Sequence, residues 1–241
     1  TYQSGGGIAV QNCVLTFTDV TISNNICYWH GGLFAFGSTI TANNIIIYNN
    51  ISDMGGGGMF IEESEGIFNN ANISHNISTH GSAGGILLYQ NPNNIIFKDS
   101  IISNNAGDNL GGGIKLEFSN PTFINTVITE NTANWGGGIY IYFSNPNFSD
   151  VLISYNTALY GGGISMAESS PTLSNITIIG NIAEEDGGGI YLYDHADNND
   201  CELCSDFFCN PNINNVTITG NSSEFGAGIF LRDSYPIITN S

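Results

Sequence analysis

A repeat of 25 to 28 residues runs through nearly the whole chain and limits what it can fold into. Each copy contains a Gly cluster followed by an apolar anchor residue, and one interval between anchors is extended to 39 residues. The anchors are Ile8, Leu33, Met59, Ile86, Ile114, Ile139, Ile164, Ile190 and Ile229. Because one short unit cannot bury its own apolar face, this period predicts a stack of similar units that share a continuous core.

A second marker recurs in phase with the first. An Asn stands eight to ten residues before each anchor from the second onward, and an Ile stands three residues before that Asn. The Asn residues are Asn25, Asn50, Asn76, Asn105, Asn131, Asn156, Asn181 and Asn221. We expect this Asn to lie at a bend, stacked on its counterparts and hydrogen-bonded to backbone groups that the bend leaves unpaired. The Gly cluster supplies positive φ and close approach between coils, so both markers are structural.

Each unit contains three segments with strand character. In residues 136–160 these are Gly-Gly-Gly-Ile-Tyr-Ile-Tyr, Pro-Asn-Phe-Ser-Asp and Val-Leu-Ile-Ser-Tyr-Asn. Each alternates with period two and is bounded by Gly, Pro or Asn, which is typical of short strands. The pattern predicts an all-β, right-handed parallel β-helix of about nine coils with three short strands per coil, forming one solenoid domain over residues 1–241. Inward pairs such as Ile139/Ile141 and Val151/Ile153 should form apolar ladders.

Composition and charge exclude several classes of function. The chain has 3 Lys and Arg against 21 Asp and Glu, for a formal net charge of −18. So few cations cannot neutralise a phosphate backbone or dock on anionic lipid, and no apolar run approaches the roughly 20 residues of a membrane-spanning helix. We therefore expect no nucleic-acid partner and no direct membrane insertion. With 41% hydrophobic and 10% charged residues, the chain is also unlike a disordered one.

The repeat motifs resemble those of a known group of proteins. Ile153-Ser-Tyr-Asn156 followed by Gly161-Gly-Gly-Ile164 resembles the repeats of the chlamydial polymorphic outer-membrane proteins, and more widely the β-helical passenger and adhesin-type domains of bacterial surfaces. Ile takes the place of the family's Phe, and the Gly-Gly-Ala form is only approached at Gly226-Ala-Gly-Ile229. These motifs form the fold, so the resemblance implies an adhesive or structural rod at the cell surface by analogy.

The outward positions of the first strand offer a candidate binding surface. Neighbouring coils should place them in two columns on one flat, largely aromatic face, which usually marks a contact surface, although outward aromatic residues also stabilise strands by cross-strand packing. If functional, the face would stack against sugar rings or pack against another rod. Its aromatic members are Phe34, Phe36, Phe60, Tyr89, Tyr140, Tyr142, Tyr191, Tyr193 and Phe230.

The long interval carries a Cys- and Asp-rich insertion at residues 194–210. Cys201, Cys204 and Cys209 with His195 have the composition of a Cys₃His zinc site, but a disulfide with one Cys left over is the favoured interpretation. The Asp residues of this loop offer oxygen ligands to Ca²⁺, and a solvated acidic loop is the simpler interpretation. No other cofactor is expected.

An enzymatic function is the minor alternative. Lyases acting on uronates need cations, and the chain has only Lys98, Lys115 and Arg232, on distant coils. A hydrolase needs grouped carboxylates, and the same outward column holds Glu62 and Glu117, about 10 Å apart if coils stack at about 4.8 Å. We assign no catalytic residue.

The sequence as a whole favours an extracellular or cell-surface rod. Neither end shows a polar cap, so we expect head-to-tail self-association into a filament or continuation into further coils of a longer chain, with glycans as candidate ligands. The alternative is a β-helix that binds or cleaves carbohydrate.

Overall fold

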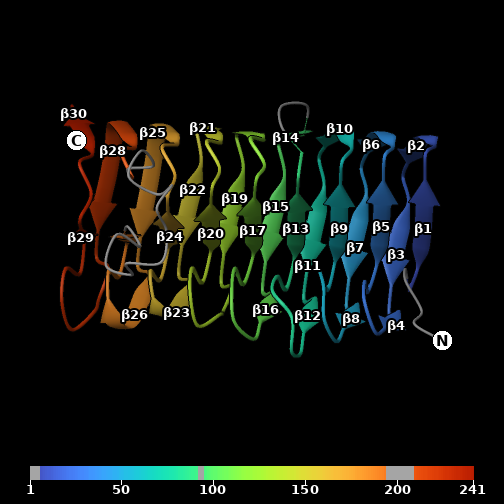
Figure 1. The fold of residues 1–241 in the computed structure, drawn as a ribbon, viewed down its shortest axis with the longest axis horizontal. Coiled ribbons are helices and arrows are strands. Elements are labelled where there is room, and N and C mark those ends of the chain that lie inside the picture. The colour runs from blue at the N-terminus through green and yellow to red at the C-terminus, as the bar shows by residue number, and fades with distance from the viewer. Residues whose placement is uncertain (1–5, 92–94, 194–208) are drawn as a thin grey trace, which may run out of the picture.

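The computed structural model describes residues 6–91, 95–193 and 209–241, and the regular structure in these ranges is entirely β-strand. The chain winds into a parallel β-helix in which equivalent strands of successive coils lie side by side along one axis (Figure 1). Each coil pairs in parallel with the next, as Ile114 with Ile139 and Ile153 with Ile178 show. The fold class predicted from the repeat is confirmed.

The anchor residues begin the strands of a nine-stranded sheet. Nine strands delimit eight complete turns, so the expected coil number of about nine is slightly too high. The strands are β1 (Ile8–Gln11), β5 (Leu33–Phe36), β9 (Met59–Glu62), β13 (Ile86–Tyr89), β17 (Ile114–Glu117), β20 (Ile139–Tyr142), β24 (Ile164–Ala167), β27 (Ile190–Tyr193) and β29 (Ile229–Arg232).

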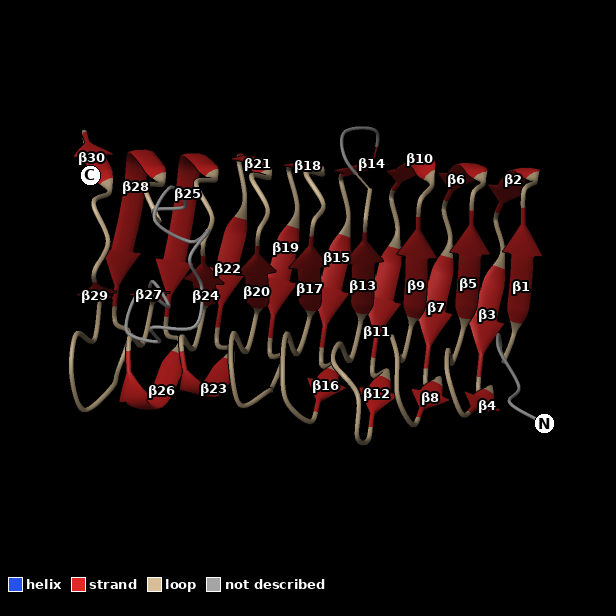
Figure 2. Cartoon of the chain, viewed as in Figure 1, coloured by secondary structure: helices blue, strands red, loops and turns tan. Residues whose placement is uncertain are grey.

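A fifteen-stranded sheet contains the second and third strands of each coil, and the two sheets run along the whole length of the helix (Figure 2). Second strands are β2 (Val14–Thr18), β6 (Thr39–Asn43), β10 (Glu65–Asn69), β14 (Ile95–Lys98), β18 (Thr122–Ile124), β21 (Asn147–Ser149) and β30 (Ile237–Thr239). Third strands are β3 (Thr21–Ser23), β7 (Ile46–Tyr48), β11 (Asn72–Ser74), β15 (Ile101–Ser103), β19 (Val127–Thr129) and β22 (Leu152–Ser154). In two coils the second and third strands merge, as β25 (Thr172–Ile179) and β28 (Asn212–Thr219).

Most coils contain a fourth short strand, so the expectation of three strands per coil is wrong. It follows the recurring Asn, where the sequence suggests only a bend. The fourth strands are β4 (Ile26–Cys27), β8 (Ile51–Ser52), β12 (Ile77–Ser78), β16 (Ala106–Gly107), β23 (Thr157–Tyr160) and β26 (Ile182–Asp186). The bend at the Asn is only one residue long. The residues that follow it can therefore pair with those of the adjacent coil before the longer loop begins.

The core is a set of ladders along the helix axis. The predicted inward residues Ile139, Ile141 and Ile153 have no exposed surface, and Val151 is 2% exposed. Four second-strand rings add a stack that the sequence interpretation missed: neighbouring ring centroids lie 4.7, 5.2 and 5.1 Å apart, and the planes are within 10° of parallel. The rings are those of Phe68, Phe97, Phe123 and Phe148. Burial of these ladders is the main stabilising contribution.

The recurring Asn forms the predicted ladder. The Asn131 side chain accepts hydrogen bonds from the backbone N–H and the Nδ2 of Asn105, both at 3.0 Å. Its own Nδ2 donates to the Ile102 carbonyl and to the Asn156 side chain, also at 3.0 Å. Asn50 to Asn181 repeat this pattern at full burial or close to it, so each Asn both joins two coils and satisfies a bend.

Two further ladders were not expected. At the turn after the first strand, Ser119 N–H donates to Ser144 Oγ at 2.9 Å, and Ser144 N–H donates to Ser169 Oγ at 3.1 Å. At the turn between second and third strands, exposed Asn and Asp residues with positive φ form hydrogen bonds between coils. Asn125 Nδ2, for example, donates to Asp99 Oδ1 at 2.7 Å. The sequence does contain this signal, because an Asn or Asp stands three residues before each third-strand Ile.

The Gly cluster has both predicted roles. Gly136 has a φ of +63°, a left-handed conformation that favours glycine. A Cβ on the next residue, Gly137, would lie 2.7 Å from the carbonyl oxygen of Gly162 in the next coil. The coils can therefore approach each other at this corner only without side chains.

Candidate functional site

The outer face of the nine-stranded sheet holds the predicted aromatic residues in the expected register. One column contains Phe34 beside Phe60, and further along Lys115 beside Tyr140. The second column contains Glu117 beside Tyr142 and Ala167 beside Tyr193. Residues far apart in the sequence are thus brought together by coil stacking alone.

The exposure of this face differs from the prediction. Tyr140, Tyr191 and Tyr193 are 5%, 4% and 8% exposed, so these three rings are buried although they point outward from their strands. Phe34, Phe36, Phe60, Tyr89, Tyr142 and Phe230 are half-buried. The prediction of one flat aromatic face is therefore wrong, because the large rings pack over one another and over the smaller residues of adjacent coils.

Strand β24 explains how the buried cluster forms. Its outward residues are Ser165 and Ala167, which leave room between the tyrosines of β20 and β27. Tyr140 and Tyr193 therefore meet across the intervening coil, with their hydroxyl oxygens 3.0 Å apart. Burial raises the pKa of Tyr140 to about 12 and also raises that of Tyr193, so both phenols stay neutral.

Two rings that stand four residues before an anchor, Trp135 and Tyr160, complete this group. Trp135 stacks on Tyr160 with centroids 4.4 Å apart, and it contacts Tyr191 at 5.8 Å and Tyr193 at 5.4 Å. Tyr191 stacks on Phe230 at 5.3 Å. We call this set the aromatic cluster: Trp135, Tyr142, Tyr160, Tyr191, Tyr193 and Phe230.

A row of more accessible rings continues along the other edge of the face. Phe118 is 44% exposed, and its ring centroid lies 6.3 Å from that of Tyr89, 6.3 Å from Tyr142 and 5.3 Å from Phe143, on which it stacks. We call Tyr89, Phe118, Tyr142 and Phe143 the aromatic rim. Phe118 and Phe143 have positive φ at the turn after their strands, which turns their rings back toward the sheet. The rim offers contiguous π-faces to a ligand.

Charges lie among these rings. Lys115 is buried beside the rim, with its Nζ 2.7 Å from Glu117 Oε2 and 3.2 Å from Ser82 Oγ. Burial raises the pKa of the Tyr142 phenol, and the carboxylates of Glu168 and Glu117 raise it further. Two carboxylates therefore lie near Tyr142, and Lys115 offsets the charge of one of them.

The other predicted aromatic residues form a separate group near the N-terminal end of the described chain. His30 stacks on Phe34 with centroids 4.4 Å apart and contacts the Phe60 ring at 4.6 Å. Burial lowers the pKa of His30 to about 4, so the imidazole is neutral at physiological pH. In the register Leu87 and Lys115 stand between this group and Tyr140, so the aromatic residues do not form one continuous stripe.

The cysteine and metal predictions fall mainly outside the described residues, which exclude Cys201, Cys204, His195 and the acidic loop residues 194–208. Cys209 is described and is fully buried, paired through a bridge with Ser234. The register of Thr172 with Asn212 places Cys209 in the serine-ladder position of its coil. Within the described ranges no group of three or more His, Cys, Asp or Glu residues could hold a metal ion. The same ranges contain no helix long and apolar enough to span a membrane.

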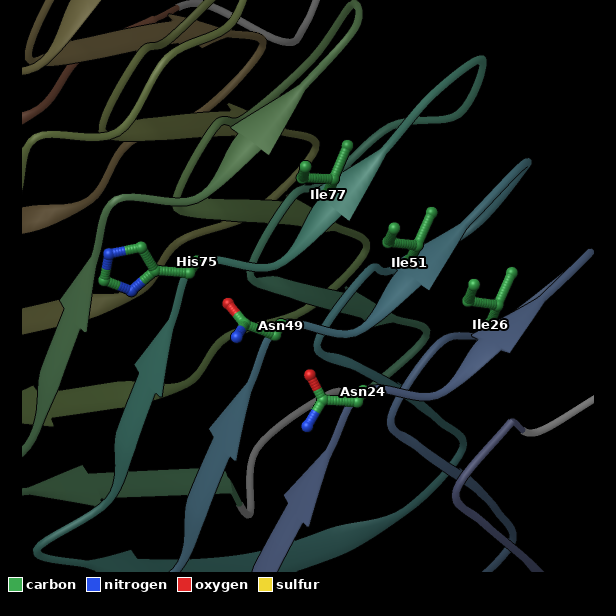
Figure 3. A pocket seen from close by; sticks show the side chains of 6 residues that line it. All are labelled: Asn24, Ile26, Asn49, Ile51, His75 and Ile77. Carbon is green, nitrogen blue, oxygen red and sulfur yellow. The ribbon is translucent and has the colours of Figure 1, made fainter.

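A groove of about 310 Å³ lies away from the aromatic face, at the bend between third and fourth strands. Figure 3 shows its two parallel columns of side chains, one polar and one of isoleucines. Ile26 is 77% and Ile77 is 39% exposed. The lining residues are Asn24, Ile26, Asn49, Ile51, His75 and Ile77. This apolar groove was not predicted, because the fourth strands that present the isoleucines were not recognised.

The rim and cluster also contain residues that the sequence interpretation missed. Trp135 and Tyr160 each stand four residues before an anchor, and Phe118 and Phe143 each stand four residues after one. Their fixed offsets from the anchors were the available signal. These positions lie outside the three strand segments that the repeat pattern predicts.

The chain matches one family model along its whole length. The model is that of the right-handed β-helix region, and it matches residues 1–123, 46–206 and 108–241 in overlapping segments. No curated protein and no solved structure gives a significant match.

Proposed function

The chain belongs to the right-handed β-helix family, and from that premise we propose that it is an adhesive rod of the cell surface that holds glycans against the outer face of its nine-stranded sheet. The observation that carries the proposal is the aromatic rim. Its rings are half-buried or exposed, adjacent in space and supported from behind by a rigid sheet. Sugar rings present C–H faces that pack on such aromatic surfaces.

The arrangement of the face supports binding rather than simple packing. Tyr89 and Tyr142 of the rim lie on strands, and Phe118 and Phe143 follow directly after strands, whose backbones are fixed by pairing with two neighbouring coils. Tyr142 packs against the buried group of Ala167, Tyr191 and Tyr193, so this ring has little freedom to move. A preorganised row of rings loses little conformational entropy on binding.

Two features support the adhesive and extracellular part of the proposal. The repeat motifs resemble those of β-helical adhesin-type domains, and the described strands form an elongated stack with a long lateral surface. A rod of this kind can present the same face to a ligand at intervals along its length. Repetition of weak contacts along a rod would raise the avidity for a polymeric glycan.

The experiment is glycan binding by the purified chain and by a double variant, Phe118→Ser with Tyr142→Ser. We expect the wild-type chain to bind at least one class of oligosaccharide, and the double variant to have a Kd at least about tenfold higher. Tyr140, Tyr191 and Tyr193 are left unchanged, because substitution of buried rings would test stability instead.

Tyr155→Ser is the matched control. Tyr155 is 61% exposed and has positive φ, as Phe118 has, but it follows β22 of the other sheet. Its substitution should leave glycan binding unchanged. Equal binding by the wild-type chain and the rim variant, with unchanged circular dichroism, would refute the role of the rim.

Glycan cleavage is a second candidate, because two carboxylates act on the same phenol. Glu117 lies one coil before Tyr142 and Glu168 one coil after it, and each raises the pKa of Tyr142. Two coils at about 4.8 Å each correspond to about 10 Å, near the upper limit for an inverting pair. Release of reducing ends that is lost in Glu168→Gln would support cleavage. If no bound glycan releases reducing ends, cleavage is refuted and binding is the remaining function.

A further inference from the structure

The outer face is acidic and has few cations to offset its charge. Its described acidic residues near the rings include Glu62, Glu117, Glu168 and Asp186, whereas the cations of its two columns are Lys115 and Arg232. Lys115 is 8% exposed, and its ammonium group is held by Glu117 at 2.7 Å. A ligand approaching the rim therefore finds no accessible cation at Lys115.

The charge of the whole chain acts in the same direction. A formal net charge of −18 creates a negative potential around the rod, and a face lined by carboxylates adds to it locally. The raised pKa of Tyr142, which Glu168 and Glu117 increase beyond the effect of burial, agrees with this sign. An anionic ligand would meet repulsion at long range, and the Lys115 ammonium is not exposed to neutralise it at the rim.

Aromatic faces beside carboxylates suit a different ligand charge. A cation is attracted to the face of an aromatic ring and, separately, to a nearby carboxylate. Phe118 and Tyr142 supply the rings. Beside them lie Glu117, which is bonded to Lys115, and Glu168, which is 6% exposed, so two carboxylates and one ammonium group leave a net negative charge. Among glycans, this combination fits sugars that carry a protonated amine.

We infer that the aromatic rim selects glycans built of amino sugars with free amines and rejects polymers of uronic acids. This inference rests on the proposed glycan-binding function and adds the chemical class of the ligand. Selectivity arises because the ammonium groups are attracted by the carboxylates and rings, whereas uronate carboxylates are repelled by the same groups.

Three soluble probes of similar length test the inference: oligomers of glucosamine, of N-acetylglucosamine and of galacturonic acid. Binding is measured by isothermal titration calorimetry on the whole chain, at mildly acidic pH, at which the sugar amine is protonated. We expect the Kd to rise in the order glucosamine, N-acetylglucosamine, galacturonic acid, with at least about a tenfold difference between the first and the last. The preference should decrease as salt screens the charges.

Two variants that change a charge but nearly keep the size of the side chain make the test specific. Glu117→Gln removes a negative charge and should weaken glucosamine binding about two- to fivefold, whereas Lys115→Met removes a positive charge and should strengthen it by a similar factor. The neutral N-acetylglucosamine probe should bind both variants as it binds the wild-type chain. Circular dichroism and thermal melting show whether each variant keeps its fold.

The outcomes separate the inference from the function on which it rests. Galacturonate binding as tight as or tighter than glucosamine binding, with loss on substitution of Phe118 and Tyr142, would overturn the inference and support the glycan-binding function. A preference for glucosamine that is unchanged in both charge variants would also overturn the inference. No binding of any of the three probes would count against the proposed function itself.

Discussion

Asn131→Ala tests whether the buried Asn ladder holds the coils together. The substitution removes four hydrogen bonds of about 3.0 Å made by one fully buried side chain. It leaves two buried donors of Asn105 without an acceptor, the backbone N–H and one Nδ2 hydrogen, whereas the Ile102 carbonyl still lies in the strand ladder. At about 1–3 kcal/mol for each unsatisfied buried group, the cost is about 2–6 kcal/mol.

We expect a loss of about 3–4 kcal/mol in the free energy of unfolding. This value is below the upper limit of that range, because the space left by the amide is polar and a water molecule can bond some of the groups that line it. The measurement is urea denaturation followed by circular dichroism, with the m-value compared between variants to show that the same structure unfolds.

Asn125→Gly is the control in the same coil. Asn125 makes an exposed inter-coil hydrogen bond of 2.7 Å to Asp99, and glycine keeps its positive φ without strain. The control should lose less than about 1 kcal/mol. If Asn131→Ala costs no more than this control, the ladder is a consequence of coil stacking and not one of its causes.

Three further predictions concern other parts of the fold. Phe123→Ala removes the third ring of the buried stack and should destabilise the chain by about 3–5 kcal/mol in urea denaturation, and a loss below about 1 kcal/mol would contradict the packing described. His30 has a pKa lowered to about 4, so its unfolded form takes up a proton near pH 6.5 and its folded form does not. Stability should fall as the pH decreases from 6.5 to about 4, by up to about 3 kcal/mol from this residue, and His30→Phe should remove that part of the pH dependence. Ser165 has a buried hydroxyl without a hydrogen-bond partner in the described ranges, so Ser165→Ala should leave the melting temperature unchanged or raise it, and a clear decrease would reveal a missed partner.

Most of the fold could be predicted from the sequence because each coil of a β-helix places similar residues in the same local environment. The anchor, the third-strand Ile and the Asn recur in phase, and each position has the same neighbours above and below. Stacking therefore converts a linear pattern directly into ladders, as the hydrogen bonds from Asn50 to Asn181 show. The fourth strands escaped prediction because two residues such as Ile51 and Ser52 are too few to show a period.

The candidate site was predicted in register but not in exposure. Alternation shows that Tyr140 and Tyr193 point outward from their strands, and this is correct. It does not show that both rings lean over Ser165 and Ala167, meet at 3.0 Å and become buried. Nor does a strand pattern indicate that Phe118, in a turn, joins the row of rings.

The repeat pattern is enough to predict the parallel β-helix, its inward ladders and the structural roles of Asn and Gly. These features depend on contacts between equivalent positions of adjacent coils, which the spacing of the repeat already specifies. Which outward rings remain accessible, and which charges lie beside them, depends on packing in three dimensions. That outcome depends on the sizes of residues two coils apart and on the conformations of turns, as the meeting of Tyr140 with Tyr193 and the pairing of Lys115 with Glu117 show.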